Sequence, residues 1–232
     1  MNNLQKMGGI AALIEAATYL LGMVVAFIVL APTWSYSPEQ YVAFLVDNQT
    51  FLHLWHLAIY VINGVFLVVL VLGLNERLQR HSPALMQVAT AVGLIWAGLV
   101  IASGMLIINN LGVVAEQYGQ NPDQAVTIWL ALAAVESGLG GAIELPGGLW
   151  LLLVSWAAWR GGELPRGLNI LGMLVGAVGV VTAVPTLGEL GAVFGLGCIA
   201  WFIWIGIFML RRPVSQPITP SNPIAPHPST VG

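Results

Sequence analysis

The chain has 232 residues, of which 58% are apolar and only 7% carry a formal charge, and its formal net charge is −3 at pH 7. Soluble domains carry about 25% charged residues, so this chain has too few of them to cover a water-facing surface. The composition therefore excludes a soluble enzyme, a nucleic-acid-binding protein and a disordered scaffold, and it indicates a membrane protein whose solvent and partner is the lipid bilayer.

Six apolar segments are long enough to cross a membrane, because a hydrocarbon core about 30 Å thick needs about 20 helical residues. A helix satisfies its own backbone hydrogen bonds, whereas an open strand edge in lipid does not. The expected fold class is therefore all-α, a six-transmembrane-helix bundle within residues 1–212. Its predicted spans are residues 8–31, 52–74, 84–108, 138–159, 166–185 and 188–210.

All the basic residues fall on one side of this six-span arrangement, at the two termini and in two short loops, and the three opposite loops have none. They are Lys6, Arg77, Arg80, Arg160, Arg166, Arg211 and Arg212. Loops rich in Lys and Arg stay in the cytoplasm. The N- and C-termini are therefore both predicted to be cytoplasmic.

Two of the opposite loops contain the same signal for the start of a helix. At residues 37–40 and 121–124, a capping residue is followed by Pro, an acid and Gln, which is the order of a capping box. Each motif predicts a short helix at the outer interface, over residues 41–47 and 125–137. The motifs lie 84 residues apart, and further self-matches at similar offsets suggest three tandem helical hairpins, the third without an outer helix.

The first predicted span carries a polar stripe, because Glu15, Thr18, Tyr19 and Gly22 are spaced to share one helix face. A charged side chain within a bilayer is costly and usually faces the interior of the bundle. Glu15 and Tyr19 are therefore candidate ligand-binding or ion-binding residues.

The second predicted span has His53, His56, Tyr60 and Asn63, whose spacing places all four on one face. Two histidines three residues apart, joined by a carboxylate from another helix, suit zinc, iron or manganese. The alternative is that His53 and His56 are hydrogen-bonded anchors at the interface, beside Trp55. All four are candidate binding residues, the two histidines are also candidate metal ligands, and the sequence identifies no cofactor.

In the fourth predicted span, Glu144 is followed by Pro146. Because proline lacks an N–H, the helix is expected to kink here at a polar, water-accessible point. A carboxylate next to broken helical backbone is a common arrangement for an ion or substrate site, so Glu144 completes the candidate binding residues. The remaining acids of the outer side are expected to be solvated at the interface: Glu39, Glu116, Glu136 and Glu189.

Residues 213–232 contain six of the thirteen prolines and, apart from His227, no acidic or basic side chain. Such a segment cannot bury an apolar core, so it is expected to be a disordered Pro-rich cytoplasmic tail.

Four segments resemble a family of bacterial multi-pass membrane proteins known only as a domain of unknown function. They are residues 8–15 (GGIAALIE), 138–144 (GLGGAIE), 147–156 (GGLWLLLVSW) and 194–201 (FGLGCIAW). The resemblance spans residues 1–212 and implies a location in the bacterial inner (cell) membrane. It implies no reaction and no catalytic residue.

The leading hypothesis from the sequence is a membrane protein that binds or transports a small ligand, an ion or a proton through its buried carboxyl groups. Hydrolase chemistry is not favoured, because the residue sets of an intramembrane serine protease or a metal-dependent lipid hydrolase are missing. Two alternatives stay open. One is a non-catalytic subunit that assembles with a membrane-protein partner or as a homo-oligomer, and the other is a metal or redox site at the histidine pair.

Overall fold

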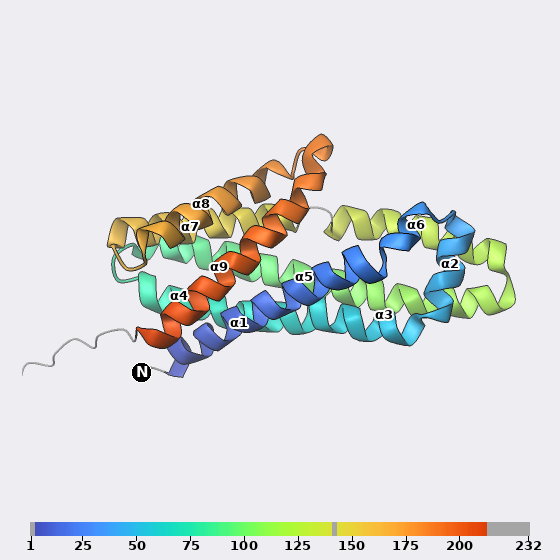
Figure 1. Cartoon of the computed structure of the whole chain (residues 1–232), viewed down its shortest axis with the longest axis horizontal. Coiled ribbons are helices and arrows are strands. Elements are labelled where there is room, and N and C mark those ends of the chain that lie inside the picture. Colours follow the sequence, from blue (N-terminus) through green and yellow to red (C-terminus); the bar gives the residue numbers. More distant parts are fainter. Residues whose placement is uncertain (1–2, 141–142, 213–232) are drawn as a thin grey trace, which may run out of the picture.

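The computed structural model describes residues 3–140 and 143–212, and these residues form an elongated bundle of helices (Figure 1). No strand occurs within the two described ranges, which confirms the all-α fold class. The expected tail, residues 213–232, lies outside the described residues.

The helices follow one another with short connections. The first half of the chain contains α1 (Asn3–Val24), the π-helical η1 (Val25–Val29), the 3₁₀-helical η2 (Ala31–Ser35), α2 (Pro38–Asp47), α3 (Gln49–His56), the π-helical η3 (Leu57–Ile62), α4 (Asn63–Leu78) and α5 (Pro83–Gln120). The second half contains α6 (Pro122–Gly140), α7 (Glu144–Gly161), α8 (Arg166–Val181), the 3₁₀-helical η4 (Pro185–Leu190) and α9 (Gly191–Arg211).

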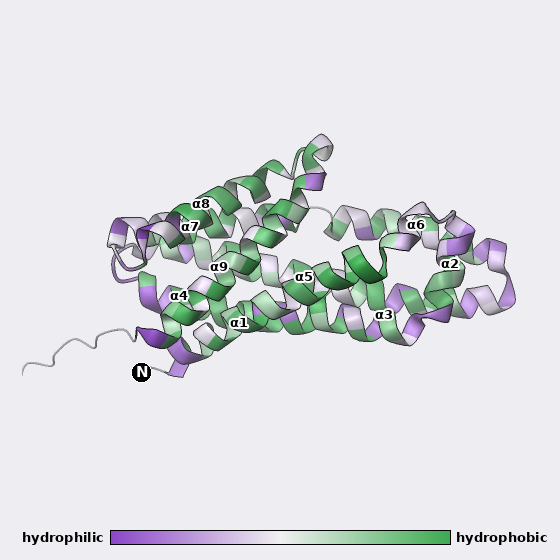
Figure 2. Ribbon diagram, in the orientation of Figure 1, coloured by the Kyte–Doolittle hydropathy of each residue, from purple (hydrophilic) through white to green (hydrophobic). Residues whose placement is uncertain are grey.

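Five stretches are long and apolar enough to cross a membrane by length and composition, which supports a multi-pass membrane protein. They are Asn3–Val29, Gln49–Leu78, Pro83–Gln120, Pro122–Gly161 and Thr186–Arg211. The remaining predicted span, residues 166–185, forms α8, which is also apolar but has only 16 residues. Figure 2 shows hydrophobic residues along the middle of the bundle and hydrophilic residues at its two ends.

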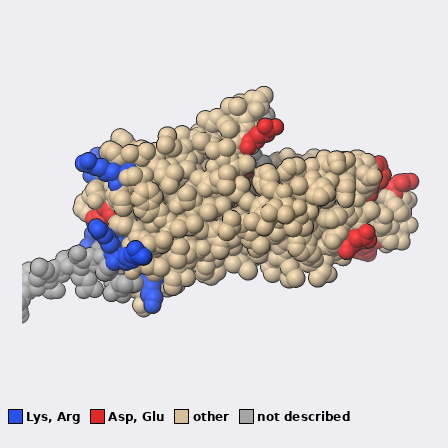
Figure 3. Space-filling model, viewed as in Figure 1, with Lys and Arg blue, Asp and Glu red and all other residues tan. Residues whose placement is uncertain are grey.

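Charge is sorted between the two ends of the molecule. In Figure 3, Lys and Arg gather at one end, here called the basic end. Several Asp and Glu side chains gather at the opposite end, here called the acidic end, where Glu39, Glu116 and Asp123 are exposed. The first and last described residues both lie at the basic end, so the chain crosses the bundle an even number of times (Figure 1).

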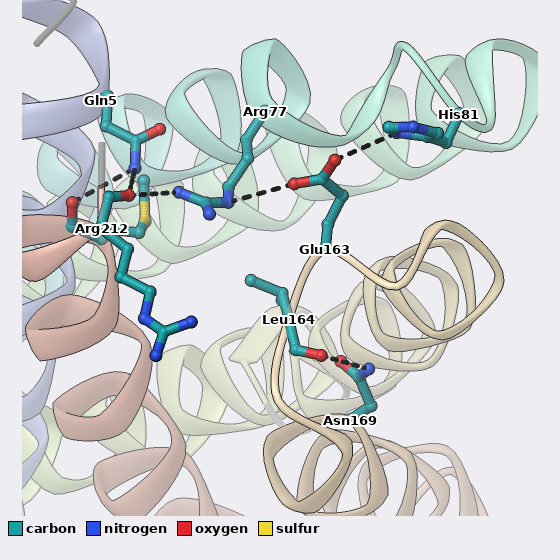
Figure 4. Close-up of polar contacts among 8 residues, drawn as sticks. Gln5, Arg77, His81, Glu163, Leu164, Asn169 and Arg212 are labelled. Atoms are coloured by element: carbon teal, nitrogen blue, oxygen red, sulfur yellow. Dashed lines mark hydrogen bonds and ion pairs between the residues drawn. The ribbon is translucent and has the colours of Figure 1, made fainter. Parts of the chain in front are cut away.

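Polar contacts join the first and last described helices at the basic end (Figure 4). The Gln5 side chain and the Arg77 guanidinium both donate hydrogen bonds to the Arg212 carbonyl oxygen, at 3.3 and 2.9 Å. Glu163 lies between Arg77 and His81, with nitrogen–oxygen distances of 4.0 and 3.2 Å. These contacts join the N-terminus of α1 to the C-termini of α4 and α9.

Both predicted capping motifs begin helices. Ser37 and Gln40 exchange two hydrogen bonds in a complete capping box at the start of α2. The Asn121 side chain accepts from the Gln124 N–H at 3.1 Å at the start of α6. The two helices pack against each other and against α5, around a small apolar cluster at the acidic end.

The helix that contains the third predicted span, residues 84–108, is longer than that span, because α5 continues to Gln120. The polar residues beyond 108 find partners: Asn110 donates from its side chain to Glu136 on α6 at 2.7 Å. The expected full solvation of Glu136 is therefore wrong. The polar residues after 108 look like a loop in the sequence, but α6 supplies hydrogen-bond partners for them, so the helix continues. It ends shortly before Pro122.

The sequence predicts one helix with a kink at Pro146, whereas the structure has two helices, α6 and α7, with Pro146 in the second. α6 ends at Gly140 and α7 begins at Glu144, so Pro146 lies in the first turn of α7. Proline is tolerated there because an N–H in the first turn has no partner within the helix. The Glu144 carboxyl group consequently lies at a helix N-terminus.

Glycine allows α7 and α8 to pack backbone against backbone. A Cβ atom added at Gly148 would lie 2.6 Å from the Gly176 carbonyl oxygen, and one at Gly176 would lie 2.7 Å from the Gly148 carbonyl oxygen. Small residues at such contacts let membrane helices approach closely. The α7–α8 pair thereby forms a rigid wall beside the buried Trp150 and Trp201.

Gly148→Ala is expected to lower the thermal midpoint of the detergent-solubilised protein, because the added methyl group meets backbone atoms that cannot move aside. Overpacking of this kind costs about 1–3 kcal/mol. The matched control is Gly98→Ala on α5, where an added Cβ meets nothing within 4 Å and replaces a poor helix former. Equal midpoints for the two variants would contradict the close α7–α8 contact.

Candidate functional site

A cavity of about 410 Å³ lies among α1, α4, α5, α7 and α9 and the two π-helical segments. Its lining brings together four of the predicted binding residues: Tyr19, Tyr60, Asn63 and Glu144. Thr18 and Gly22 of the predicted stripe on α1 also line it. The stripe on α1 and the carboxyl group on α7 therefore meet at one place, as the sequence suggests.

The cavity occupies a wedge between α1 and α9. The two helices touch near the basic end, where a Cβ added at Gly9 would lie 3.3 Å from the Gly206 carbonyl oxygen. Farther along, a Cβ added at Gly195 would meet only the side chains of Met23 and Tyr19, at 3.8 and 3.9 Å. Figure 1 shows this divergence as a V between the two ribbons.

Two π-helical segments border the cavity. Ala26 and Phe27 of η1 line it on one side, and Ile59 and Tyr60 of η3 on another. A π-helical turn inserts an extra residue into a helix, shifts the register of the following side chains and occurs often at functional sites. Two irregular helical turns, one after α1 and one before α4, therefore border the cavity.

The floor of the cavity is a buried hydrogen-bond cluster. The Asn63 side-chain amide donates to Glu15 Oε2 at 2.5 Å and to the Thr18 hydroxyl oxygen at 2.8 Å. The Thr18 hydroxyl donates to the Glu15 backbone carbonyl at 3.0 Å. Glu15 is completely buried. The predicted residues Glu15 and Asn63 therefore form one unit, with Asn63 between the carboxyl group and the cavity.

Glu15 has no cationic partner among the described residues. Arg77 and His81, which pair with Glu163, lie at the basic end. Glu15 Oε1 is buried and makes no hydrogen bond within the described part of the chain. A buried, unpaired carboxylate is costly, whereas the neutral acid loses less on leaving water.

Glu144 occupies a different environment from Glu15. It is partly exposed, lines the cavity and begins α7. Its Oε1 lies 3.4 Å from the position of a Cβ added at Gly191, the first residue of α9. Glu144 lies in the first turn of α7, whereas α9 continues directly from η4 and has no free N-terminus beside it.

Aromatic rings make up much of the remaining wall. The rings that line the cavity are those of Tyr19, Phe27, Trp55, Tyr60, Trp96 and Phe194. The Trp96 ring packs against Trp150, which packs against Trp201 in the core, and the ring centroids of each pair are 5.7 Å apart. The Nε1 of Trp55 is buried without a hydrogen-bond partner among the described residues. The wall is therefore apolar, with few polar groups.

The predicted single face of His53, His56, Tyr60 and Asn63 is divided by η3. Tyr60 and Asn63 line the main cavity, whereas His56 lines a second cavity of about 90 Å³ with Glu136 and Asn110. The His56 and Tyr60 rings still stack, with centroids 6.0 Å apart. The regular 3.6-residue spacing fails here because the π-helical turn rotates the residues after it.

Both histidines interact with their own helix. The Nδ1 atoms of His53 and His56 lie 3.3 and 2.7 Å from the backbone carbonyl oxygens of Gln49 and Leu52. Within residues 3–140 and 143–212, no three His, Cys, Asp or Glu side chains are placed to hold a metal ion together. These contacts agree with the anchor alternative, and nothing in the described residues supports the metal or redox hypothesis.

Sequence reasoning did not identify Trp55, Trp96, Phe194 and Gly191 as lining residues. Apolar and small side chains in a membrane span give no signal that separates a cavity wall from ordinary packing. Only the divergence of α1 and α9, which is a tertiary feature, exposes them to the cavity.

A family model described as "Domain of unknown function (DUF4386)" matches residues 9–212. The chain belongs to this family. The match covers every residue that lines the cavity, and residues 213–232 fall outside it. No curated protein and no solved structure matches the chain.

A double-mutant cycle tests the cluster below the cavity. Asn63→Leu and Glu15→Met are each expected to destabilise the folded protein, because each leaves the other polar group buried without its partner, at a cost of about 1–3 kcal/mol. The double variant should lose less stability than the sum of the two single variants, by about 1–3 kcal/mol. Unfolding midpoints in detergent measure this difference, and strictly additive effects would show that the two side chains do not interact.

Proposed function

We propose that the protein binds a small amphiphilic organic cation in the main cavity, with Glu144 and the aromatic wall as the recognising groups. The size of the cavity supports this, because small-molecule sites usually have volumes of about 300–1,000 Å³ and mostly apolar walls with a few polar groups. The cavity of about 410 Å³ has this size and this composition.

The charge of the lining is the observation that carries the proposal. Glu144 lines the cavity, Glu15 lies directly beneath it, and no Lys or Arg is among its lining residues. The basic side chains instead gather at the basic end (Figure 3). Aromatic faces also attract cations, by about 0.5–2 kcal/mol per ring. An anionic ligand would meet carboxyl groups and the negative faces of aromatic rings, so a cation fits better.

The surroundings of the cavity support an amphiphilic ligand. Phe27 lines the cavity and is half exposed, and Val193, which lies between the lining residues Ala192 and Phe194 on α9, is also exposed. The wedge between α1 and α9 thus leads from the cavity to the surface that faces lipid. A ligand with an apolar body and a positively charged group would reach the carboxyl groups from the bilayer.

The location and orientation of the protein are part of the proposal. The resemblance to bacterial membrane proteins suggests the inner membrane, and the gathering of Lys and Arg at one end suggests that this end is cytoplasmic. The cavity would then lie toward the outer side of the membrane, because its lining residues come from the C-terminal part of α1 and the N-terminal part of α9, and both helices have their other ends at the basic end (Figure 1).

Binding of benzyltrimethylammonium tests the proposed ligand class, with the neutral isostere neopentylbenzene as the matched probe. Quenching of the tryptophan fluorescence is expected for the cation, because Trp55 and Trp96 line the cavity. Glu144→Gln should weaken binding of the cation by about tenfold or more, equivalent to about 1.4 kcal/mol, and leave binding of the neutral probe unchanged. The control is Glu116→Gln, an exposed residue at the acidic end.

Equal binding of both probes, or an unchanged affinity for the cation in Glu144→Gln, would contradict the proposal. The assembly-partner hypothesis would then be the better reading of the sequence.

Cysteine labelling tests the orientation. The native Cys198 is completely buried, so introduced thiols are the reactive ones. Asn121→Cys, at the acidic end, is expected to react with a membrane-impermeant maleimide on intact cells, and Gln79→Cys, at the basic end, only after lysis. The reverse pattern would show that the basic end faces outward.

A further inference from the structure

We propose that Glu15 holds a proton in the empty protein and releases it when a cation occupies the cavity, so that the site exchanges one positive charge for another. This inference rests on the proposed function, and it names a role for a residue that the ligand does not touch. Under this proposal Glu144 attracts the cation and Glu15 loses its proton when the cation binds, so the two carboxyl groups act together.

The resting state follows from the surroundings of Glu15. The side chain is completely buried, Oε2 accepts one hydrogen bond from Asn63, and Oε1 has no partner among the described residues. A carboxylate anion normally needs several hydrogen bonds or a cation when it leaves water. With one donor and no cation, the neutral acid with its proton on Oε1 is the form that fits.

The other ionisable groups around Glu15 do not supply positive charge. Tyr19 lies one helical turn away on α1, Cys198 on α9 is close enough to interact electrostatically with Glu15, and Glu144 and Tyr60 line the cavity from α7 and η3. The group contributed by α4 is the uncharged amide of Asn63. None of these groups becomes a cation at any pH, so only a ligand can provide a positive charge close to Glu15.

Asn63 connects the carboxyl group to the ligand. Its amide group donates simultaneously to Glu15 and to Thr18, and both Asn63 and Thr18 line the cavity. A cation above this floor stabilises a negative charge on Glu15 through a low-dielectric gap, where the attraction is strong. The ligand and the proton therefore compete for the same negative charge.

The exchange needs no other reactant. The O–H bond of the Glu15 carboxyl group breaks, its electron pair stays on Oε1, and the proton passes to a water molecule that reaches the cavity. The cation balances the new carboxylate, so the net charge of the buried site does not change. Glu144, which is partly exposed, attracts the cation in both states.

Proton release on binding tests the exchange. Benzyltrimethylammonium is titrated into the purified full-length protein in a weakly buffered detergent solution that contains a pH-indicating dye. The wild type is expected to release about one proton per bound probe. Because a released proton appears in the binding equilibrium, the apparent affinity should rise about tenfold per pH unit until Glu15 is ionised in the empty protein.

Glu15→Gln distinguishes Glu15 from Glu144 as the source of the proton. Glutamine has almost the same shape and keeps an oxygen that accepts from Asn63, so the fold should be preserved. This variant is expected to bind the probe without releasing a proton and with an affinity that does not depend on pH. Cys198→Ala is the matched control on α9 and should release the proton as the wild type does.

Release of one proton by Glu15→Gln would overturn the exchange at Glu15 and leave the proposed function intact. Failure of the wild type to bind the probe would instead overturn the proposed function and the exchange with it.

Infrared spectroscopy gives a probe-independent measurement of the resting state. The ligand-free wild type is expected to show a protonated carboxyl C=O band that is missing in Glu15→Gln, and the absence of such a band from the wild type would also overturn the inference.

Discussion

The hydrogen bond between Asn63 and Glu15 is the interaction on which the geometry of the cavity depends. It joins α1 to α4 at a depth where the surrounding side chains are apolar, and its acceptor is a completely buried carboxyl group. Polar groups at such depth must find partners inside the bundle, because lipid offers none. This requirement fixes the rotation of α1, and that rotation directs Thr18, Tyr19 and Gly22 toward the same space.

Two irregularities then turn this polar contact into a cavity. The π-helical turn η1 follows α1 and the π-helical turn η3 directly precedes Asn63, and both border the cavity. The helices α1 and α9 diverge beyond their close contact at Gly9 and Gly206. At the basic end, the side chains of Gln5 and Arg77 both donate hydrogen bonds to the Arg212 carbonyl oxygen and so hold α1 and α4 against the end of α9. The bundle is therefore closed at the basic end and open toward the level of Glu144.

The sequence predicted those features that depend on local chemistry. Apolar length revealed the helices, the motifs at Ser37 and Asn121 revealed the starts of α2 and α6, and the i, i+3, i+4 spacing grouped Glu15 with Thr18 and Tyr19. The threefold hairpin repeat stays a prediction. Features set by tertiary packing were missed, such as the continuation of α5 past residue 108, which depends on Asn110 meeting Glu136.

The predicted face with the two histidines shows that sequence spacing can also fail within a single helix. A regular helix places His53, His56, Tyr60 and Asn63 together, and the spacing gives no sign of the π-helical turn that separates His56 from Asn63. The aromatic wall was also beyond sequence reasoning, because a tryptophan that lines a cavity and one that fills the core have the same pattern in an apolar span. Trp96 and Trp150, in ring contact, illustrate both cases.

The most direct test is a crystal structure of the protein with 4-bromobenzyltrimethylammonium, in which anomalous scattering locates the bromine atom. An anomalous peak is expected inside the wedge between α1 and α9, with the ammonium group toward Glu144 and the ring of Tyr60 beside it. A peak only on the outer surface of the bundle, or no peak at a saturating concentration of the probe, would contradict a cation site above Glu15.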